Sequence, residues 1–163
     1  MTSASQDLPV DDLKQSPIGI APSTAGALPG EVVLTQGNYE ALAAFRFELR
    51  RFLQFSEEMA RSLGLTPQQH QALLAIRAAA GQEMSIGVLA EQLFIQPHSA
   101  SELADRLVAL GLLARETAED DRRRVRLRLT PAAEDRLSRM TTVHRDEVVR
   151  MRGTLTAILA RLD

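Results

Sequence analysis

The chain has 163 residues, of which 45% are hydrophobic, so it is long enough for one domain with a core, or for one domain and a tail. Its net charge of −2 excludes a strong overall preference for nucleic acid, and because residues 1–37 carry one lysine and four acids, the remaining residues have a net charge of only +1. The absence of cysteine excludes disulfides, thiolate catalysis, thiol redox sensing and zinc sites with cysteine ligands.

Residues 1–37 are rich in proline, glycine, serine, threonine and alanine, with no aromatic residue and no sustained apolar period. This composition is typical of a largely disordered tail. From Asn38 the apolar residues follow a heptad spacing as far as Gly64, which predicts one long helix over residues 38–64. The heptad positions hold Leu42, Phe45, Leu49, Phe52, Met59 and Leu63, with Ser56 as the polar member.

The capping residues that follow predict a second helix. Thr66 can serve as the N-cap, Pro67 occupies the first helical position, and Gln69 closes a capping box. We expect this helix to run from about Pro67 to Ala80 and to stop at Gly81.

Two further helices are separated by only three residues, 94–96. The first can be capped by Ser85, and the second begins near Pro97 and ends at Gly111. A three-residue connection has the length of the turn in a helix-turn-helix. The spacing turns the apolar residues of both helices inward: Leu89, Ala90, Leu93, Ala100, Leu103, Ala104, Leu107 and Leu110.

After Gly111 the hydrophobic period changes from helical to alternating. The segments "LLARE" and "RVRLRL" predict two short strands that form a hairpin with a charged tip. One face of the second strand holds Val125, Leu127 and Leu129, and the other holds Arg124, Arg126 and Arg128. The arginine face can contact a polyanion, face solvent, or form ion pairs with the next helix, and the sequence leaves these alternatives open.

Thr130 and Pro131 repeat the cap-and-proline pattern and begin a fifth helix, and a short last helix is expected after Gly153. Residues recur at helical spacing on one face of each: Ala133, Leu137, Met140, His144 and Val148 on the fifth, and the apolar Leu155, Ile158, Leu159 and Leu162 on the last. Apolar stripes on helices at both ends of a small domain need a partner surface, so we expect a homodimer.

A helix-turn-helix followed by a hairpin is the winged-helix arrangement, so the fold class is mainly α with a small β-hairpin wing (α+β). The major groove of DNA admits one helix, while a hairpin can reach the adjacent minor groove with an arginine. The acids on the outward face of the fourth helix fit a polyanion poorly. Glu102 either accepts a hydrogen bond from cytosine or pairs with Arg106 or another arginine. The candidate contacts on this helix are Pro97, His98, Ser99, Ser101, Glu102 and Arg106.

Residues 65–131 resemble the MarR family of winged-helix transcriptional regulators. The resemblance lies in "LTPQQHQALLAI", "LAEQL", "QPHSASELADRLVALGLLARE" and "DDRRRVRLRLT". It implies a homodimer, with dimerisation helices over 38–64 and 132–163, that binds a pseudopalindromic operator, usually as a repressor. The wing contacts would be Asp121, Arg122 and Arg123. Glu102 departs from the basic or polar residue of many relatives, and Ala133 replaces a common glycine.

The family often releases DNA when a small ligand occupies a cleft between the dimerisation helices and the DNA-binding domain. On this chain the cleft candidates are Phe45, Phe52 and His70, for a small aromatic or anionic ligand. His70 and His144 can equally be structural histidines, and the phenylalanines can be core or dimer contacts.

No motif supports catalysis, since the chain lacks a glycine-rich phosphate loop, a nucleophile elbow and a closely spaced histidine pair. We therefore expect no enzyme activity, no cofactor and no metal. Neither a signal peptide nor an apolar run of membrane-spanning length is present, so we expect a cytoplasmic protein with no membrane partner. The alternative function is a winged helix that docks a protein through Glu102 and Asp105.

Overall fold

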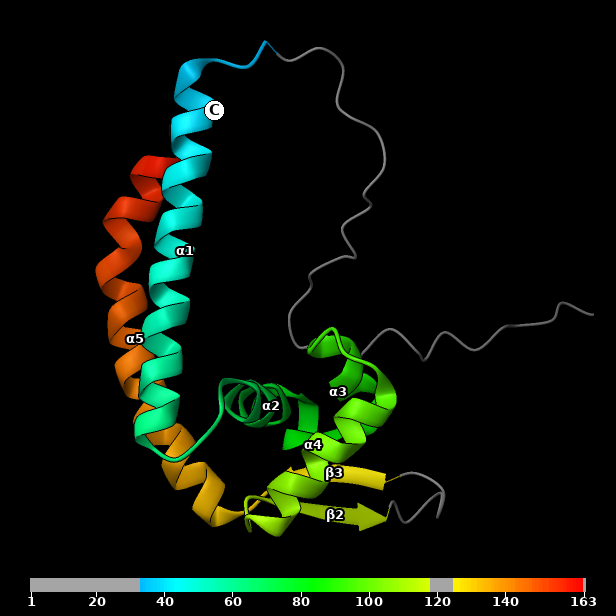
Figure 1. The fold of residues 1–163 in the computed structure, drawn as a ribbon. Coiled ribbons are helices and arrows are strands. Elements are labelled where there is room, and N and C mark those ends of the chain that lie inside the picture. Colours follow the sequence, from blue (N-terminus) through cyan, green and yellow to red (C-terminus); the bar gives the residue numbers. More distant parts are fainter. Residues whose placement is uncertain (1–32, 118–124, 163) are drawn as a thin grey trace, which may run out of the picture.

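The computed structural model describes residues 33–117 and 125–162. Residues 1–32 of the tail expected over 1–37, and the tip of the hairpin over 118–124, lie outside the described residues. Within them, the helices and strands follow the order α1 (Gln36–Ser62), α2 (Pro67–Ala78), a 3-10 turn (Ala80–Gln82), β1 (Glu83–Ser85), α3 (Ile86–Gln92), α4 (Pro97–Ala109), β2 (Leu113–Thr117), β3 (Val125–Leu129) and α5 (Pro131–Leu159) (Figure 1). The predicted fold class is confirmed, because short helices and a small sheet lie between two long helices.

The two long helices α1 and α5 lie side by side and antiparallel, and we call this pair the arm (Figure 1). Side chains join the helices near both their middle and their far end. Arg51 of α1 lies 3.7 Å from the carboxylate of Glu147 on α5. Beyond the end of α5, Arg161 pairs with Glu40, and its carbonyl accepts a 3.2 Å hydrogen bond from Asn38. The start of α1 is therefore fixed to the end of the chain.

Helix α1 begins at Gln36, two residues before the predicted start, because a capping box forms inside the expected tail. The Thr35 side chain accepts a hydrogen bond from the backbone N–H of Asn38, and the Asn38 side chain accepts one from the backbone of Thr35. Two otherwise unpaired backbone donors are satisfied in this way.

The other predicted caps are confirmed. The reciprocal bonds of Thr66 and Gln69 measure 3.2 and 2.9 Å, and Ser85 and Thr130 each accept a backbone N–H at the start of α3 and α5. Helix α2 ends at Ala78, slightly earlier than predicted, because the 3-10 turn begins at Ala80 and places Gly81 at φ +66°.

The sheet has three antiparallel strands in the order β1-β3-β2, so the predicted hairpin gains a strand on its free edge. Strand β1 comes just before α3 and pairs Met84 with Leu127. The sequence did not predict β1, since three residues are too few to show an alternating pattern. This strand brings residue 83 to the side of residues 126 and 128, although more than forty positions separate them.

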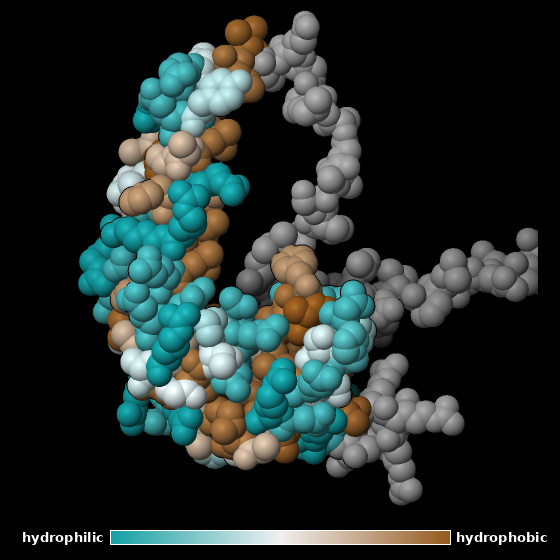
Figure 2. Space-filling view, in the orientation of Figure 1, coloured by the Kyte–Doolittle hydropathy of each residue, from teal (hydrophilic) through white to brown (hydrophobic). Residues whose placement is uncertain are grey.

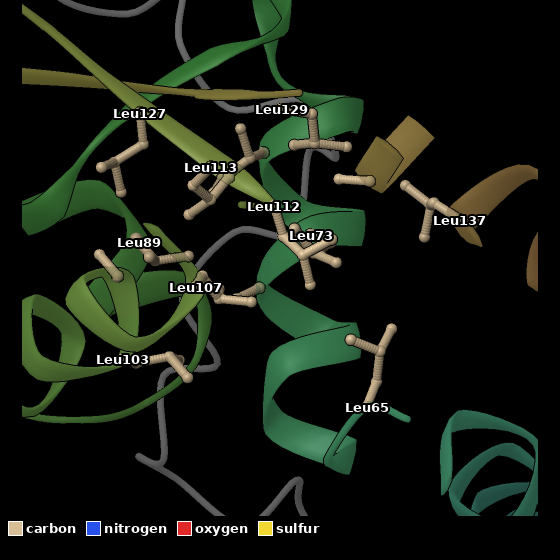
Figure 3. Close-up of a cluster of buried hydrophobic side chains, with 14 of the residues drawn as sticks. Leu65, Leu73, Leu89, Leu103, Leu107, Leu112, Leu113, Leu127, Leu129 and Leu137 are labelled. Atoms are coloured by element: carbon tan, nitrogen blue, oxygen red, sulfur yellow. The ribbon is translucent and has the colours of Figure 1, made fainter. Parts of the chain in front are cut away.

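Leucines from α2, α3, α4, the sheet and α5 converge on one core (Figure 3). We call α2, α3, α4 and the sheet the winged-helix unit. The prediction that Leu110 is buried was wrong, because 53% of its surface is exposed. Leu110 is the C-cap of α4, and Gly111 at φ +68° turns the chain so that Leu112 enters the core instead.

Helix α5 runs without a break from Pro131 to Leu159, so the prediction of a separate last helix after Gly153 was wrong. A glycine inside a helix costs only about 1 kcal/mol relative to alanine. No proline accompanies Gly153 to end the helix, and α1 packs along α5.

The arm leaves many large apolar side chains exposed. Figure 2 shows such side chains along the edge of α1 that faces the hollow above the winged-helix unit. On α1 the exposed residues are Tyr39, Leu42, Phe45, Phe47, Leu49 and Leu53, and at α5 or just beyond it they are Val148, Val149, Leu159 and Leu162. No described helix is long and apolar enough to cross a membrane.

Candidate nucleic-acid interface

Helix α4 has one buried and one polar face. Ala100, Leu103, Ala104 and Leu107 point into the core, which fixes the orientation of the helix. The opposite face carries exposed or partly exposed polar side chains. The predicted contacts from Pro97 to Arg106 therefore lie together on one accessible surface: Pro97, His98, Ser99, Ser101, Glu102 and Arg106.

The N-terminus of α4 differs from those of the other α-helices described. Gln96 is its N-cap and makes no side-chain hydrogen bond to the first turn, whereas Thr35, Thr66, Ser85 and Thr130 each do at their own helices. Pro97 removes one of the donors that a cap would satisfy. The remaining N–H groups of the first turn have no side-chain cap, and such groups favour an anion such as phosphate.

Arg115 on β2 joins the hairpin to the polar face of α4. Its guanidinium lies 2.7 Å from the carboxylate of Asp105 and donates to the backbone carbonyl of Ser101 at 3.3 Å and to its hydroxyl at 3.4 Å. This residue could not be identified from the sequence, because no local spacing links a strand arginine to a helix ten residues earlier. Arg115 offsets one of the two acids on this face and sets the hairpin beside the helix.

Glu102 is the acid that remains. It is exposed, and within the described ranges no ion pair joins it to Arg106 or to any other arginine. We predicted that Glu102 could form an ion pair with an arginine. Among the described residues, Asp105 forms such a pair on this face and Glu102 does not. A carboxylate in this position can accept a hydrogen bond from a donor on a partner.

Arg126 and Arg128 of β3 pair with acids of the sheet, and among the described residues neither pairs with an acid of α5. Arg126 and Arg128 both contact the carboxylate of Glu83 on β1, at 2.9 Å for Arg128. Arg128 also lies 3.5 Å from Glu116 on β2. The expected alternative of ion pairs with α5 is replaced by this arrangement, because the unpredicted β1 supplies the nearer acid.

The predicted wing contacts Asp121, Arg122 and Arg123 lie outside the described residues, as does Arg124. The described strands end at the paired residues Thr117 and Val125, which form the base of the wing.

A second group of side chains meets where the arm contacts the winged-helix unit. The rings of His70 and His144 stack with centroids 5.0 Å apart, and His144 makes edge contacts with Phe52 at 5.8 Å and Phe55 at 5.6 Å. Two predicted cleft residues, Phe52 and His70, therefore lie around His144. Phe45, by contrast, makes no ring contact with this group and is 39% exposed.

His144 has one buried ring nitrogen without a partner among the described residues. Its Nδ1 lies 2.7 Å from the backbone oxygen of Met140 and must donate to it, so in the neutral ring Nε2 is an acceptor. That Nε2 is buried and makes no hydrogen bond in the described part of the chain. A buried acceptor of this kind is costly unless a donor reaches it.

Burial, together with charge repulsion from the neighbouring His144, lowers the pKa of His70 from 6.5 to about 4. His70 is therefore neutral near pH 7. Across 33–117 and 125–162, no three histidine or acidic side chains gather closely enough to hold a metal ion.

Comparisons with known proteins support the same arrangement. Residues 63–124 match the model of a family described as the MarR family. A search of curated sequences finds no match. AbsC, a MarR family transcriptional regulator from Streptomyces coelicolor, is 22% identical, with a TM-score of 0.61 over 74% of this chain and 81% of AbsC.

Two other structures with the same fold contain a ligand. A mutant of MepR from S. aureus, bound to an oligodeoxyribonucleotide, is 21% identical, with a TM-score of 0.61 over 77% of this chain and 98% of MepR. NadR in complex with 4-hydroxyphenylacetate is 20% identical, with a TM-score of 0.59 over 78% of this chain and 86% of NadR. Residues 63–124 therefore match the MarR family in sequence, and the described fold is similar to that of these solved structures.

Proposed function

We propose that the chain is a homodimeric, sequence-specific DNA-binding regulator of transcription that represses from a pseudopalindromic operator. The observation that carries the proposal is the polar face of α4 set beside the β2–β3 hairpin through Arg115. A helix in this position fits the major groove while the hairpin reaches the adjacent minor groove. The shared fold of the DNA-bound MepR mutant supports the proposal.

The proposal divides the chain by role. Residues 65–131 bind DNA, and residues 38–64 and 132–163 form the dimer interface. The exposed apolar side chains of the arm support this division, because a second copy of the arm is the simplest surface that would cover them.

Within the DNA-binding part, α4 contacts bases and phosphates, and the wing contacts the minor groove. The α4 contacts are Pro97, His98, Ser99, Ser101, Glu102 and Arg106. At the tip of the wing, one of Arg122 and Arg123 enters the minor groove, and Asp121 holds the neighbouring arginine.

Selection of bound sequences from a random DNA pool tests the proposal with the full chain. We expect an enriched pseudopalindrome whose half-sites are separated by about 10 base pairs, because two copies of α4 would enter successive major grooves. An enriched site without symmetry would contradict the dimeric mode of binding. A pool without any enriched sequence would contradict DNA recognition itself.

The wing is tested by Arg122→Ala and Arg123→Ala on the selected operator. The variant of the groove-entering arginine should weaken binding by about 1–3 kcal/mol, whereas loss of a phosphate contact should lower the salt slope by about one. Arg139→Ala is the control, because Arg139 forms an ion pair with Asp135 on α5. If both wing variants titrate like the parent, the wing assignment is wrong.

We further propose that a small ligand releases the operator by binding around His144. The free acceptor Nε2 would take a hydrogen bond from a hydroxyl group, and Phe52 and Phe55 would contact an aromatic ring. The 4-hydroxyphenylacetate bound to NadR has both features. Such a ligand lowers operator affinity only if it prefers the dimer geometry that does not fit DNA. A panel of phenols and aromatic acids, added to the operator complex, measures this release.

Glu102 supports a second candidate, a winged helix that docks a basic protein surface. The carboxylate is exposed on the outward face of α4 and makes no ion pair with a described residue. A gel shift on selected DNA distinguishes the two functions. A salt-sensitive shift that resists competitor DNA supports the regulator, and its absence supports the protein-docking module.

A further inference from the structure

Four charged side chains lie on the outer face of the sheet, and we call them the sheet charge cluster: Glu83, Glu116, Arg126 and Arg128. The strand register brings them together, because Glu83 lies opposite Arg128 and Glu116 lies opposite Arg126. Directly opposed residues share a face of a sheet, and alternate residues on one strand do so too. The cluster therefore lies on the face opposite the buried Leu127.

Glu83 is the central residue of this cluster. One carboxylate oxygen contacts Arg126, and the other lies 2.9 Å from Nη2 of Arg128. The side chain of Glu83 is 21% exposed, against 40% and 46% for the two arginines. One carboxylate on the edge strand therefore holds two neighbouring guanidinium groups. Together with Glu116 it offsets both positive charges.

The cluster lies next to the part of the hairpin that the proposed function assigns to the minor groove. Arg126 follows Val125, which belongs to the last described strand pair before the tip. If no acid held them, two arginines at this point would contact phosphates on any duplex. Such contacts dominate affinity but carry no sequence information.

We propose that Glu83 is a specificity-determining positioning residue, which holds Arg126 and Arg128 on the sheet and keeps their charge away from DNA. The inference rests on the proposed DNA-binding function. Because the two arginines are held, α4 and the wing tip supply the contacts. The ratio of operator affinity to non-specific affinity is therefore higher than it would be if Arg126 and Arg128 contacted phosphates.

Glu83→Gln tests the inference, because it removes the charge and keeps the shape. In this variant, each of the two arginines that reaches a phosphate should tighten binding to a non-operator duplex about eightfold at 0.1 M salt, and steepen the salt slope by about 0.9. The control is Glu57→Gln, which removes the same charge from an ion pair with Arg61 on α1, at 2.8 Å. Its slope should equal that of the parent.

Arg126→Ala combined with Arg128→Ala completes the experiment. In the parent background the pair should leave the non-operator slope unchanged, and in the Glu83→Gln background it should restore the parent slope. A slope that falls by one or more in the parent background means that these arginines already contact phosphates, which overturns the inference. The double arginine variant in the parent background is a sufficient test on its own if Glu83→Gln fails to fold.

An unchanged slope for a folded Glu83→Gln also overturns the inference, while the proposed function stands as long as the parent binds its selected operator. A parent that binds no duplex DNA overturns the proposed function, and the inference with it.

Discussion

The winged-helix unit and the arm use the same apolar residues in opposite ways. In the unit, most leucines of α2, α3, α4 and the sheet are almost completely buried, as Leu73, Leu107 and Leu127 illustrate at 0% exposed. In the arm, the residues of α1 that are buried are the small Ala41 and Ala60, while many of its large apolar side chains remain exposed. The unit therefore closes its own core, and the arm needs another surface.

This difference separates two tasks that the proposed function requires. A helix that reads DNA must be held in one orientation, which a closed core provides. A dimer interface must be apolar and accessible before association, which the arm provides. Four predictions test this contrast, and the largest effect is expected in the core of the unit.

Leu107→Ala should lower the free energy of unfolding by about 2–5 kcal/mol, because it opens a cavity where no surface is exposed. Leu110→Ala is the matched control on the same helix, since Leu110 is 53% exposed and should cost under about 1 kcal/mol. Urea unfolding of both variants measures the difference. Equal losses would show that the core of the unit does not close as described.

Leu42→Glu combined with Leu159→Glu should raise the dissociation constant of the dimer about 100-fold, or about 3 kcal/mol, because carboxylates are costly to bury in an apolar interface. Leu42 and Leu159 are 50% and 56% exposed on the arm. Leu74→Glu is the control, since Leu74 on α2 is 42% exposed. Sedimentation measures the dimer fraction. An unchanged dimer fraction would contradict the assignment of the arm to the dimer interface.

Sequence reasoning predicted the local parts of this fold well. The caps at Thr66, Ser85 and Thr130 are encoded within three residues of each helix start, and the alternation of β3 is visible within five. These signals need no knowledge of the rest of the chain. Gly153 misled the prediction because the composition of a helix does not show what packs beside it.

The candidate site was less predictable, since its contacts join distant elements. Arg115 reaches Asp105 across the unit, and Glu83 reaches Arg128 through a strand too short to recognise. Of the five arginines within residues 122–128, Arg126 and Arg128 contact acids of the sheet, Glu83 and Glu116. Only the sheet register reveals which acid opposes which arginine.

The junction between unit and arm gives the third prediction, through His70. Its folded pKa of about 4 lies below the unfolded value of 6.5, so the unfolded chain binds more protons between these values. Stability should therefore fall by about 1–3 kcal/mol as the pH drops from 6.5 to 4, less than the full shift implies because solvent screens part of it. Unfolding curves across this pH range measure the loss.

His70→Gln should flatten this part of the pH dependence. His98→Gln should keep it, because His98 is exposed on α4 and lies outside the ring contacts of the junction. If the His70 variant retains the whole pH dependence, another group is responsible for it.

The smallest expected effect tests the continuity of the arm. Gly153 lies within α5, and a Cβ added there would meet nothing within 4 Å in a single chain. Gly153→Ala should therefore stabilise the protein by about 0.5–1 kcal/mol, because alanine loses less backbone entropy in a helix. Gly64→Ala should have the opposite sign, since Gly64 holds φ at +73° after α1. Thermal unfolding compares the two. Gly153→Ala can also be placed in the Leu42→Glu, Leu159→Glu variant, which sedimentation should show to be a monomer. If Gly153→Ala destabilises the dimer but stabilises this monomer, the added methyl group meets the partner copy. Gly153 would then mark a close approach of two arms.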